Sequence, residues 1–257
     1  MKSFQLFLIT LFLFTVSSCQ DLSHKSSDLP GPGDKTILVY GNGLHPVFIK
    51  YLAKLTNKDR AKICFLPTAA ADNPRVAEYW FNLSSGISIE PSVLITFISS
   101  SPEQQSFEQQ IMESDAIIVG GGNTLNMIAI WKAQGIDTLL RKAYNKGIIM
   151  AGGSAGSLCW FTGGYTDSRP QELTLMEGLG FLDFSHSPHY QNPTRKELFQ
   201  KAILKGDLNS GYGCDDGAGL LFINGKMVKA LSLENNCNSY FVYREYNKLV
   251  EKILPAE

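Results

Sequence analysis

The sequence lacks the short motifs that mark the commonest nucleotide-binding and zinc-binding proteins. It has no G-x-x-x-x-G-K-[ST] stretch, and no G-x-G-x-x-G stretch followed by an acidic residue for a ribose. Its five cysteines include no C-x-x-C pair. We therefore expect no nucleotide, no cofactor and no metal site.

The chain also lacks an excess of either acidic or basic residues. The formal net charge of the 257 residues is −1, and neither acidic nor basic residues form a long run. Such a balance gives no basic face for nucleic acid, so we expect no nucleic-acid partner. No internal repeat or low-complexity tract is present.

The N-terminal segment is unlike the rest of the chain. A basic start is followed by an apolar run over residues 4–16, too short to span a membrane, and then by Val16-Ser17-Ser18-Cys19. This pattern resembles a bacterial lipoprotein signal, with plain secretion and cleavage near Ser18 as the alternative. We predict a signal peptide over residues 1–19, a flexible tether over 20–34 and one domain over 35–257. Cys19 is then lipidated, and the protein is exported and anchored to a membrane.

The remaining cysteines are widely spaced. Cys64 and Cys159 lie in apolar segments and are predicted to be buried thiols. An exported chain could pair Cys214 with Cys237, and the sequence leaves that pairing open, as it does the oligomeric state.

Apolar strands alternate with amphipathic helices between residues 36 and 151. Strands are predicted at 36–40, 61–66, 93–98, 116–119 and 147–151, and helices at 45–55, 74–84, 104–113, 124–133 and 136–145. This alternation predicts an α/β fold in three layers, with a mostly parallel sheet covered on both faces. An Asn224-Gly225 turn predicts a hairpin near the C-terminus, between 218–223 and 227–231. Residues 162–190, rich in Gly, Pro and polar side chains, are predicted to be loops, and 240–243 a last strand.

One turn carries the strongest chemical signal. The predicted strand ending at Ala151 runs into Gly152-Gly153-Ser154-Ala155-Gly156, which matches the G-x-S-x-G nucleophile elbow. The turn would expose the Ser154 hydroxyl beyond the sheet and direct the Ala155 N–H toward the same point. An ordinary glycine-rich turn is the alternative.

A serine nucleophile requires a base and an acid that orients it. From the residues alone, His45, His186 and His189 all remain candidates for the base. Asp167 and Asp216 both remain candidates for the acid. Asp167 would give the chain order Ser, Asp, His of α/β-hydrolase esterases, whereas Asp216 lies in a turn beside Gly217.

Four motifs taken together resemble the peptidase E (aspartyl dipeptidase) and cyanophycinase family of serine hydrolases. They are Ile118-Val119-Gly120-Gly121-Gly122-Asn123-Thr124, Ala151-Gly152-Gly153-Ser154-Ala155-Gly156, Ser187-Pro188-His189-Tyr190 and Cys214-Asp215-Asp216-Gly217. Their order and approximate spacing are also similar to those of the family.

The resemblance implies a fold like that of class I glutamine amidotransferases, which is flavodoxin-like. It implies that Ser154 is the nucleophile and His189 the base, with Gly122 and Ala155 forming the oxyanion hole. For the acid, the family position matches Asp216, although aspartate is one methylene shorter than the family's glutamate. Asp167 matches an earlier aspartate that has also been assigned to the relay. We favour Asp216 and retain Asp167.

The resemblance also suggests how substrate is bound. Arg195 lies near the position of an arginine that recognises an acidic side chain, and Asn123 is matched to contact with the substrate backbone. We therefore predict a peptidase for short peptides, possible substrates being dipeptides with N-terminal Asp. The alternatives are a cyanophycinase-like β-aspartyl peptide hydrolase and a non-catalytic peptide-binding lipoprotein.

Overall fold

The computed structural model describes residues 29–256. The predicted signal peptide, the lipidation site Cys19 and most of the tether lie outside this range. None of the helices among the described residues has both the length and the apolar character needed to cross a membrane.

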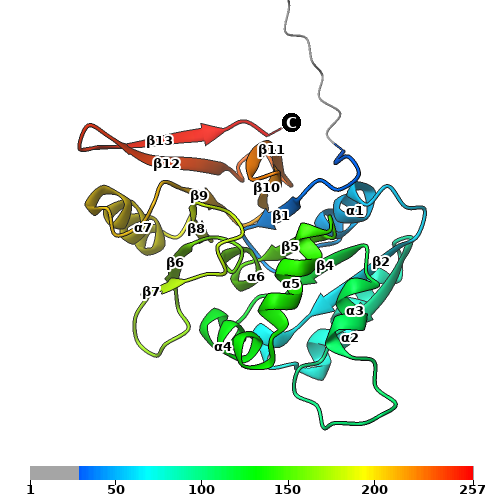
Figure 1. Cartoon of the computed structure of the whole chain (residues 1–257). Helices are drawn as coiled ribbons and strands as arrows, with labels where there is room; N and C mark the ends of the chain where they lie inside the picture. Colours follow the sequence, from blue (N-terminus) through cyan, green and yellow to red (C-terminus); the bar gives the residue numbers. More distant parts are fainter. Residues whose placement is uncertain (1–28, 257) are drawn as a thin grey trace, which may run out of the picture.

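A seven-stranded sheet forms the centre of the molecule, in the order β11-β10-β1-β5-β4-β2-β3 (Figure 1). Its parallel part contains β1 (Thr36–Tyr40), β5 (Ile149–Gly153), β4 (Ala116–Val119), β2 (Ala61–Leu66) and β3 (Ile89–Val93). The predicted α/β fold with a mostly parallel sheet is confirmed.

Helices cover both faces of this sheet because its strands are apolar on both sides. Leu38 points to the face covered by α1 (Pro46–Leu55) and α2 (Pro74–Ser84). Its neighbours Ile37 and Val39 point to the opposite face and its separate apolar core. That second face is covered by the remaining helices of the first half, α3 (Phe107–Met112), α4 (Thr124–Gln134), α5 (Ile136–Asn145) and the short α6 (Ala155–Leu158). Buried parallel strands with near-continuous apolar sequence are typical of this architecture.

The Asn-Gly hairpin is present. Strands β10 (Ala218–Ile223) and β11 (Lys226–Ser232) pair antiparallel, and β10 pairs antiparallel with β1. Asn224 and Gly225 have φ of 51° and 77°, the left-handed backbone that a tight two-residue turn requires.

A second sheet was missed by the sequence analysis. It has six strands in the order β13-β12-β9-β8-β6-β7 and lies beside the central sheet (Figure 1). The prediction that residues 162–190 are loops was wrong, because β6 (Gly163–Thr166), β7 (Thr174–Glu177) and β8 (Ser185–Pro188) fall there. The chain continues through α7 (Pro193–Lys205), β9 (Gly211–Cys214), β12 (Ser239–Glu245) and β13 (Lys248–Leu254). Strands β6, β7, β8 and β9 have four residues each and are rich in Gly, Ser and Thr, so they lack the apolar alternation that identifies a strand.

The third strand was predicted too late in the chain. It was placed at residues 93–98, whereas β3 ends at Val93. Residues Thr96 and Phe97 instead give their backbone N–H groups to the buried Asp72 carboxylate. A side chain from another segment thus satisfies these donors, and the backbone is held out of the sheet ladder.

The packing of α6 against β4 gives a test of stability. A Cβ on Gly156 would lie 2.2 Å from the Val119 carbonyl oxygen, so Gly156→Ala forces backbone atoms apart. Alanine would favour the helix by about 1 kcal/mol, but the clash should exceed this gain and lower the free energy of unfolding by about 2 kcal/mol or more. Urea unfolding monitored by circular dichroism measures the difference. Gly86→Ala, where a Cβ has nothing within 4 Å, is the matched control and should change stability by less than about 0.5 kcal/mol. Equal stability of the two variants would contradict the packing argument.

Candidate active site

Ser154 occupies a sharp turn between β5 and α6. Its backbone has φ 54° and ψ −118°, which non-glycine residues rarely adopt. Glycine is required at the two positions before Ser154, because a Cβ on Gly153 would lie 1.9 Å from the Asn42 carbonyl oxygen. A Cβ on Gly152 would lie 2.2 Å from the carbonyl oxygen of Gly156. The local geometry is therefore that of a nucleophile elbow.

The Ser154 hydroxyl begins a chain of hydrogen bonds. Its Oγ lies 2.8 Å from Nε2 of His189, and Nδ1 of the same ring lies 2.6 Å from Oδ1 of Asp216. Because the carboxylate can only accept, Nδ1 carries the proton and Nε2 of the neutral ring is free to accept from the serine. The side chain of His189 is 29% exposed and that of Asp216 46%, so a substrate can reach the ring.

The second sheet brings the histidine and the aspartate together. Strands β8 and β9 are parallel neighbours whose last residues, Pro188 and Cys214, are paired in register. The residues that follow them, His189 and Asp216, therefore leave the same edge of the sheet side by side. The Asp216 N–H also donates to Oε1 of Gln191, two residues after His189 in the chain.

The glycine run after β4 passes directly beside the serine. A Cβ on Gly121 would lie 3.6 Å from Ser154 Oγ. Gly122 has φ +137°, and a Cβ there would lie 2.2 Å from the Ala69 carbonyl oxygen, so only glycine is tolerated. Ala155 begins α6, where a backbone N–H has no acceptor within the helix. Of the two predicted oxyanion-hole residues, Ala155 therefore directly follows the serine, and Gly122 directly follows Gly121, the glycine beside it.

Asp167 is not part of the hydrogen-bonded chain. Its Oδ2 lies 2.7 Å from NH2 of Arg195, and the side chain of Asp167 is 70% exposed while that of Arg195 is 10% exposed. The other guanidinium nitrogen of Arg195 donates to the Tyr165 carbonyl. Among the two candidate acids, the structure therefore brings only Asp216 to His189.

Asn123 caps helix α4 with its own side chain. Its Oδ1 accepts from the Asn126 N–H at 2.9 Å, and its Nδ2 donates to the Ser168 carbonyl at 2.9 Å. These two bonds give the amide a structural role, and only one of its N–H groups is left for the predicted contact with substrate.

The other two candidate histidines are engaged elsewhere. His45 precedes α1, and its Nδ1 accepts from the Val47 N–H, which makes it a helix cap. His186 is completely buried, with Nδ1 2.9 Å from the Tyr212 carbonyl oxygen and Nε2 3.0 Å from Ser157 Oγ. Burial lowers the pKa of His186 to about 3, so this ring is neutral.

The bond between Ser157 and His186 was missed by sequence reasoning. Ser157 Oγ also lies 2.7 Å from the carbonyl oxygen of Ser154, so the buried pair lies directly behind the elbow. The sequence offered one indication, which was spacing. Ser157 lies three residues after Ser154, and His186 lies three residues before His189. Spacing alone does not identify a contact between segments so far apart in the chain.

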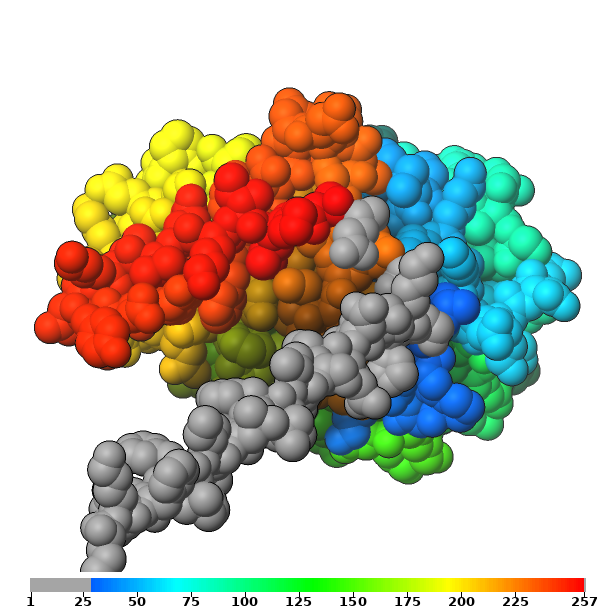
Figure 2. Space-filling view, turned by 90° about the horizontal axis from the view of Figure 1, so that it is seen from above, coloured from blue at the N-terminus to red at the C-terminus, as the bar shows by residue number. Residues whose placement is uncertain are grey.

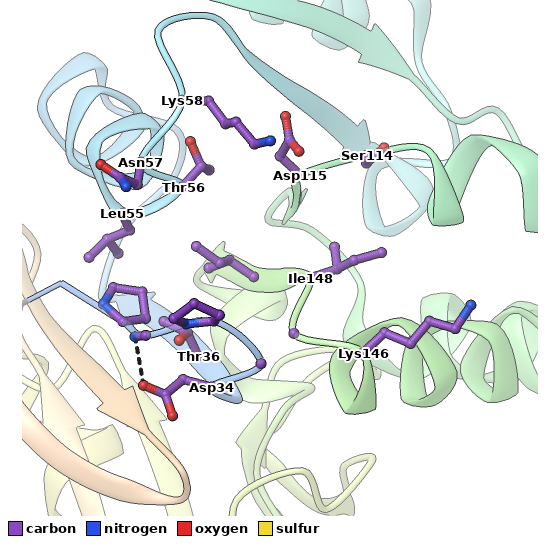
Figure 3. Close-up of a pocket in the computed structure, with 16 residues that line it drawn as sticks. Asp34, Thr36, Leu55, Thr56, Asn57, Lys58, Ser114, Asp115, Lys146 and Ile148 are labelled. Atoms are coloured by element: carbon purple, nitrogen blue, oxygen red, sulfur yellow. Dashed lines mark hydrogen bonds between the residues drawn. The ribbon is translucent and has the colours of Figure 1, made fainter.

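Two cavities lie at opposite edges of the central sheet. One, of about 250 Å³, lies beside the glycine run and is lined by Ala69, Phe97, Asn123 and their neighbours. The other, of about 570 Å³, is bordered by Thr36 and Ile149, the first residues of β1 and β5 (Figure 3). It therefore opens at the edge of the sheet opposite Ser154, and we do not assign it to the same chemistry.

The cysteines and acidic groups form no further centre in the described part of the chain. Cys64, Cys159, Cys214 and Cys237 are all free thiols, so the pairing left open for the last two is absent. Within residues 29–256, no three His, Cys, Asp or Glu side chains are arranged to hold a metal ion.

Comparison with known proteins gives a consistent assignment. Residues 37–230 match the model of peptidase family S51. The chain is 37% identical over 209 residues to the uncharacterized peptidase YgaJ of Bacillus subtilis, covering 81% of this chain and 89% of that protein. It is 31% identical to peptidase E of Shewanella denitrificans, covering 56% of this chain and 59% of that protein.

Solved structures share the fold. A peptidase from an acI-B1 actinobacterium aligns with a TM-score of 0.67 at 18% identity, covering 88% of this chain and 96% of that chain. A putative peptidase E from Listeria monocytogenes aligns with a TM-score of 0.58 at 20% identity, covering 78% of this chain and all of that chain.

The neutral state of His186 predicts a pH dependence of stability. Its pKa is about 3 in the folded protein and about 6.5 when unfolded, so the unfolded chain binds the extra proton first as the pH falls. This contribution should lower the free energy of unfolding by about 2 kcal/mol between pH 7 and pH 5. Urea unfolding at the two pH values measures it. His186→Gln should flatten the dependence, while the control His45→Gln should keep it. If wild-type stability is the same at both pH values, a neutral buried His186 is wrong.

Proposed function

Since the chain belongs to peptidase family S51 and is a serine peptidase, we propose that it hydrolyses short peptides through Ser154, His189 and Asp216. The observation that carries this proposal is the unbroken series of contacts from Ser154 Oγ to Nε2 of His189, at 2.8 Å, and from Nδ1 to Asp216, at 2.6 Å. Family membership disfavours the alternative of a non-catalytic binding protein.

In the first half of the reaction, Ser154 Oγ attacks the carbonyl carbon of the scissile peptide bond. His189 Nε2 takes the hydroxyl proton as the new C–O bond forms, and Asp216 stabilises the resulting imidazolium through the proton on Nδ1. The tetrahedral intermediate then collapses, His189 returns the proton to the departing amine, and the C–N bond breaks. An acyl-enzyme ester on Ser154 remains.

The negative charge of the intermediate develops on the former carbonyl oxygen. Ala155 directly follows Ser154, and Gly122 directly follows Gly121, which lies beside the serine; the N–H groups of Ala155 and Gly122 are the donors we assign to this oxygen. Such fixed donors need no reorganisation when the charge forms, which is the usual reason that an oxyanion hole lowers the barrier.

In the second half, water takes the place of the amine. His189 Nε2 removes a proton from the water as its oxygen attacks the ester carbonyl. The same proton is then delivered to Ser154 Oγ as the ester bond breaks, which releases the carboxylic acid product. Ser154 and neutral His189 are regenerated, so the proton balance closes without a further group.

Substitution of the two acids distinguishes their roles. With a neutral dipeptide such as Ala-Leu, Asp216→Asn should lower kcat by roughly 10³-fold or more, because the amide can donate to Nδ1 and favours the wrong tautomer of His189. Ser154→Ala should abolish turnover, and Asp167→Asn should leave kcat for Ala-Leu within about threefold. Steady-state kinetics of the purified variants measure these effects. Full activity of Asp216→Asn together with an inactive Asp167→Asn would overturn the assignment.

We further propose that Arg195 recognises the acidic side chain of an N-terminal Asp by displacement of Asp167. Ser168 contacts Asn123 beside the glycine run, and the adjacent Asp167 places an exposed carboxylate on the buried guanidinium of Arg195. A substrate carboxylate would take the place of Asp167 on that guanidinium. The planar fork of arginine suits such an exchange, since it binds any carboxylate with the same geometry.

Removal of the competing carboxylate tests this idea. Asp167→Asn should lower KM for Asp-Leu by roughly tenfold and leave KM for Ala-Leu nearly unchanged, because a charge-assisted hydrogen bond becomes available only to the acidic substrate. A β-aspartyl-arginine dipeptide in the same panel distinguishes cyanophycinase-like activity. Equal changes for Asp-Leu and Ala-Leu would show that Arg195 does not read the acidic side chain.

A further inference from the structure

The last two strands form a hairpin that lies outside the part of the chain matched to the family. The match ends at residue 230, whereas β12 and β13 pair antiparallel between Ser239 and Leu254. Figure 2 shows these strands, in red, along the surface of the molecule. We call β12–β13 the terminal hairpin. Its inner strand β12 pairs with β9, the strand that leads to Asp216.

The terminal hairpin contacts Tyr190, the residue that follows His189, through both of its strands. Tyr190 is completely buried, and its hydroxyl donates to Oε2 of Glu251 on β13 at 2.8 Å. Its ring lies 5.0 Å from the ring of Tyr240 on β12 and packs so closely on the second sheet that a Cβ on Gly213 would lie 2.5 Å from it. The Tyr190 N–H donates to the Cys214 carbonyl at 3.0 Å. Tyr190 is thus fixed at its backbone, its ring and its hydroxyl.

Glu251 is the charged centre of this contact. Its Oε1 lies 2.7 Å from the Lys196 ammonium, and its Oε2 also accepts from Gln200 at 2.7 Å. Burial alone would raise the pKa of Glu251, but the bonds from Lys196 and Tyr190 lower it below the ordinary value. The carboxylate is therefore ionised and fully engaged at neutral pH.

Tyr240 of the terminal hairpin and Asn238, the residue directly before β12, also hold the residue before Asp216. The buried Asp215 accepts from the Asn238 N–H at 3.0 Å and from the Tyr240 hydroxyl at 3.3 Å, both through Oδ2. The Asp215 N–H in turn donates to the Asn238 carbonyl. Lys196 joins the two contacts, since its ammonium lies 5.1 Å and 5.0 Å from the ring centres of Tyr190 and Tyr240.

His189 needs such support because its backbone is strained. Its φ is 54°, in the left-handed region that costs a non-glycine residue about 1–3 kcal/mol and persists only where neighbours enforce it. Tyr190, the residue after His189, is held at its backbone N–H, its ring and its hydroxyl. Relaxation of the φ of His189 would move the imidazole away from Ser154 Oγ.

We propose that the terminal hairpin is a positioning device for the proton relay, with Glu251 as the positioning residue that fixes His189 through Tyr190. It acts on the residues adjacent to the base and the acid and touches neither the substrate nor the reacting atoms. This inference rests on the proposed function, because it assigns a role to the hairpin only if His189 and Asp216 form the relay.

The test is Glu251→Gln in the full chain, with Tyr190→Phe as a second variant that removes only the hydroxyl. Both should lower kcat for Ala-Leu by roughly tenfold with KM within about twofold, because a small displacement of the base slows acylation without altering substrate binding. The rate of Ser154 labelling by a fluorophosphonate probe should fall by the same factor. All assays are done at least 15 °C below the Tm of each variant, so that unfolding does not contribute.

Glu197→Gln is the matched control. It breaks the exposed ion pair of Glu197 with Lys201 on the same helix, α7, and should leave kcat, KM and labelling unchanged. If Glu251→Gln and Tyr190→Phe keep wild-type kcat and labelling rates while Ser154→Ala is inactive, the positioning role is wrong and the proposed function stands. If Ser154→Ala retains activity, the proposed function itself fails.

Discussion

The hydrogen bond between Ser154 and His189 joins two sheets that the chain builds separately. Ser154 follows β5 of the central sheet, and His189 follows β8 of the second sheet. Both residues have a positive φ near 54°, so each side of the contact is held in backbone that would relax if left alone. The surrounding packing must therefore specify both turns at once.

On the serine side, close backbone contacts hold the turn at Ser154. A Cβ on Gly153 or Gly156 would overlap a carbonyl oxygen of another segment, and a Cβ on Gly152 would overlap the Gly156 carbonyl oxygen across the turn. Because backbone atoms of neighbouring segments lie against these three glycines, the turn at Ser154 cannot shift without a steric clash. The buried bond between Ser157 and His186 adds a second link from α6 to β8, parallel to the one between Ser154 and His189.

On the histidine side, strand pairing and side-chain contacts specify the turn. The parallel register of β8 and β9 brings His189 and Asp216 to one edge, and the terminal hairpin packs on Tyr190 and Asp215, the residues next to them. Arg195, in the helix that follows His189, is buried against the second sheet and paired with Asp167. The second sheet thus positions His189 and Asp216 of the relay and also Arg195, the cationic group proposed to recognise the substrate.

The sequence by itself determined the features that arise from short-range patterns. Apolar runs between amphipathic helices specified the parallel sheet, Asn224-Gly225 specified a hairpin, and the glycines around Ser154 specified an elbow, because each depends on neighbours in the chain. Only the tertiary structure decided which carboxylate reaches His189, since Asp167 and Asp216 look alike until strand pairing places one at the ring and the other on Arg195. Most of the second sheet was also decided there. The strand predicted at 240–243 lies within β12, but β6, β7, β8 and β9 have four residues each and show no apolar pattern of their own, so only strand pairing identifies them.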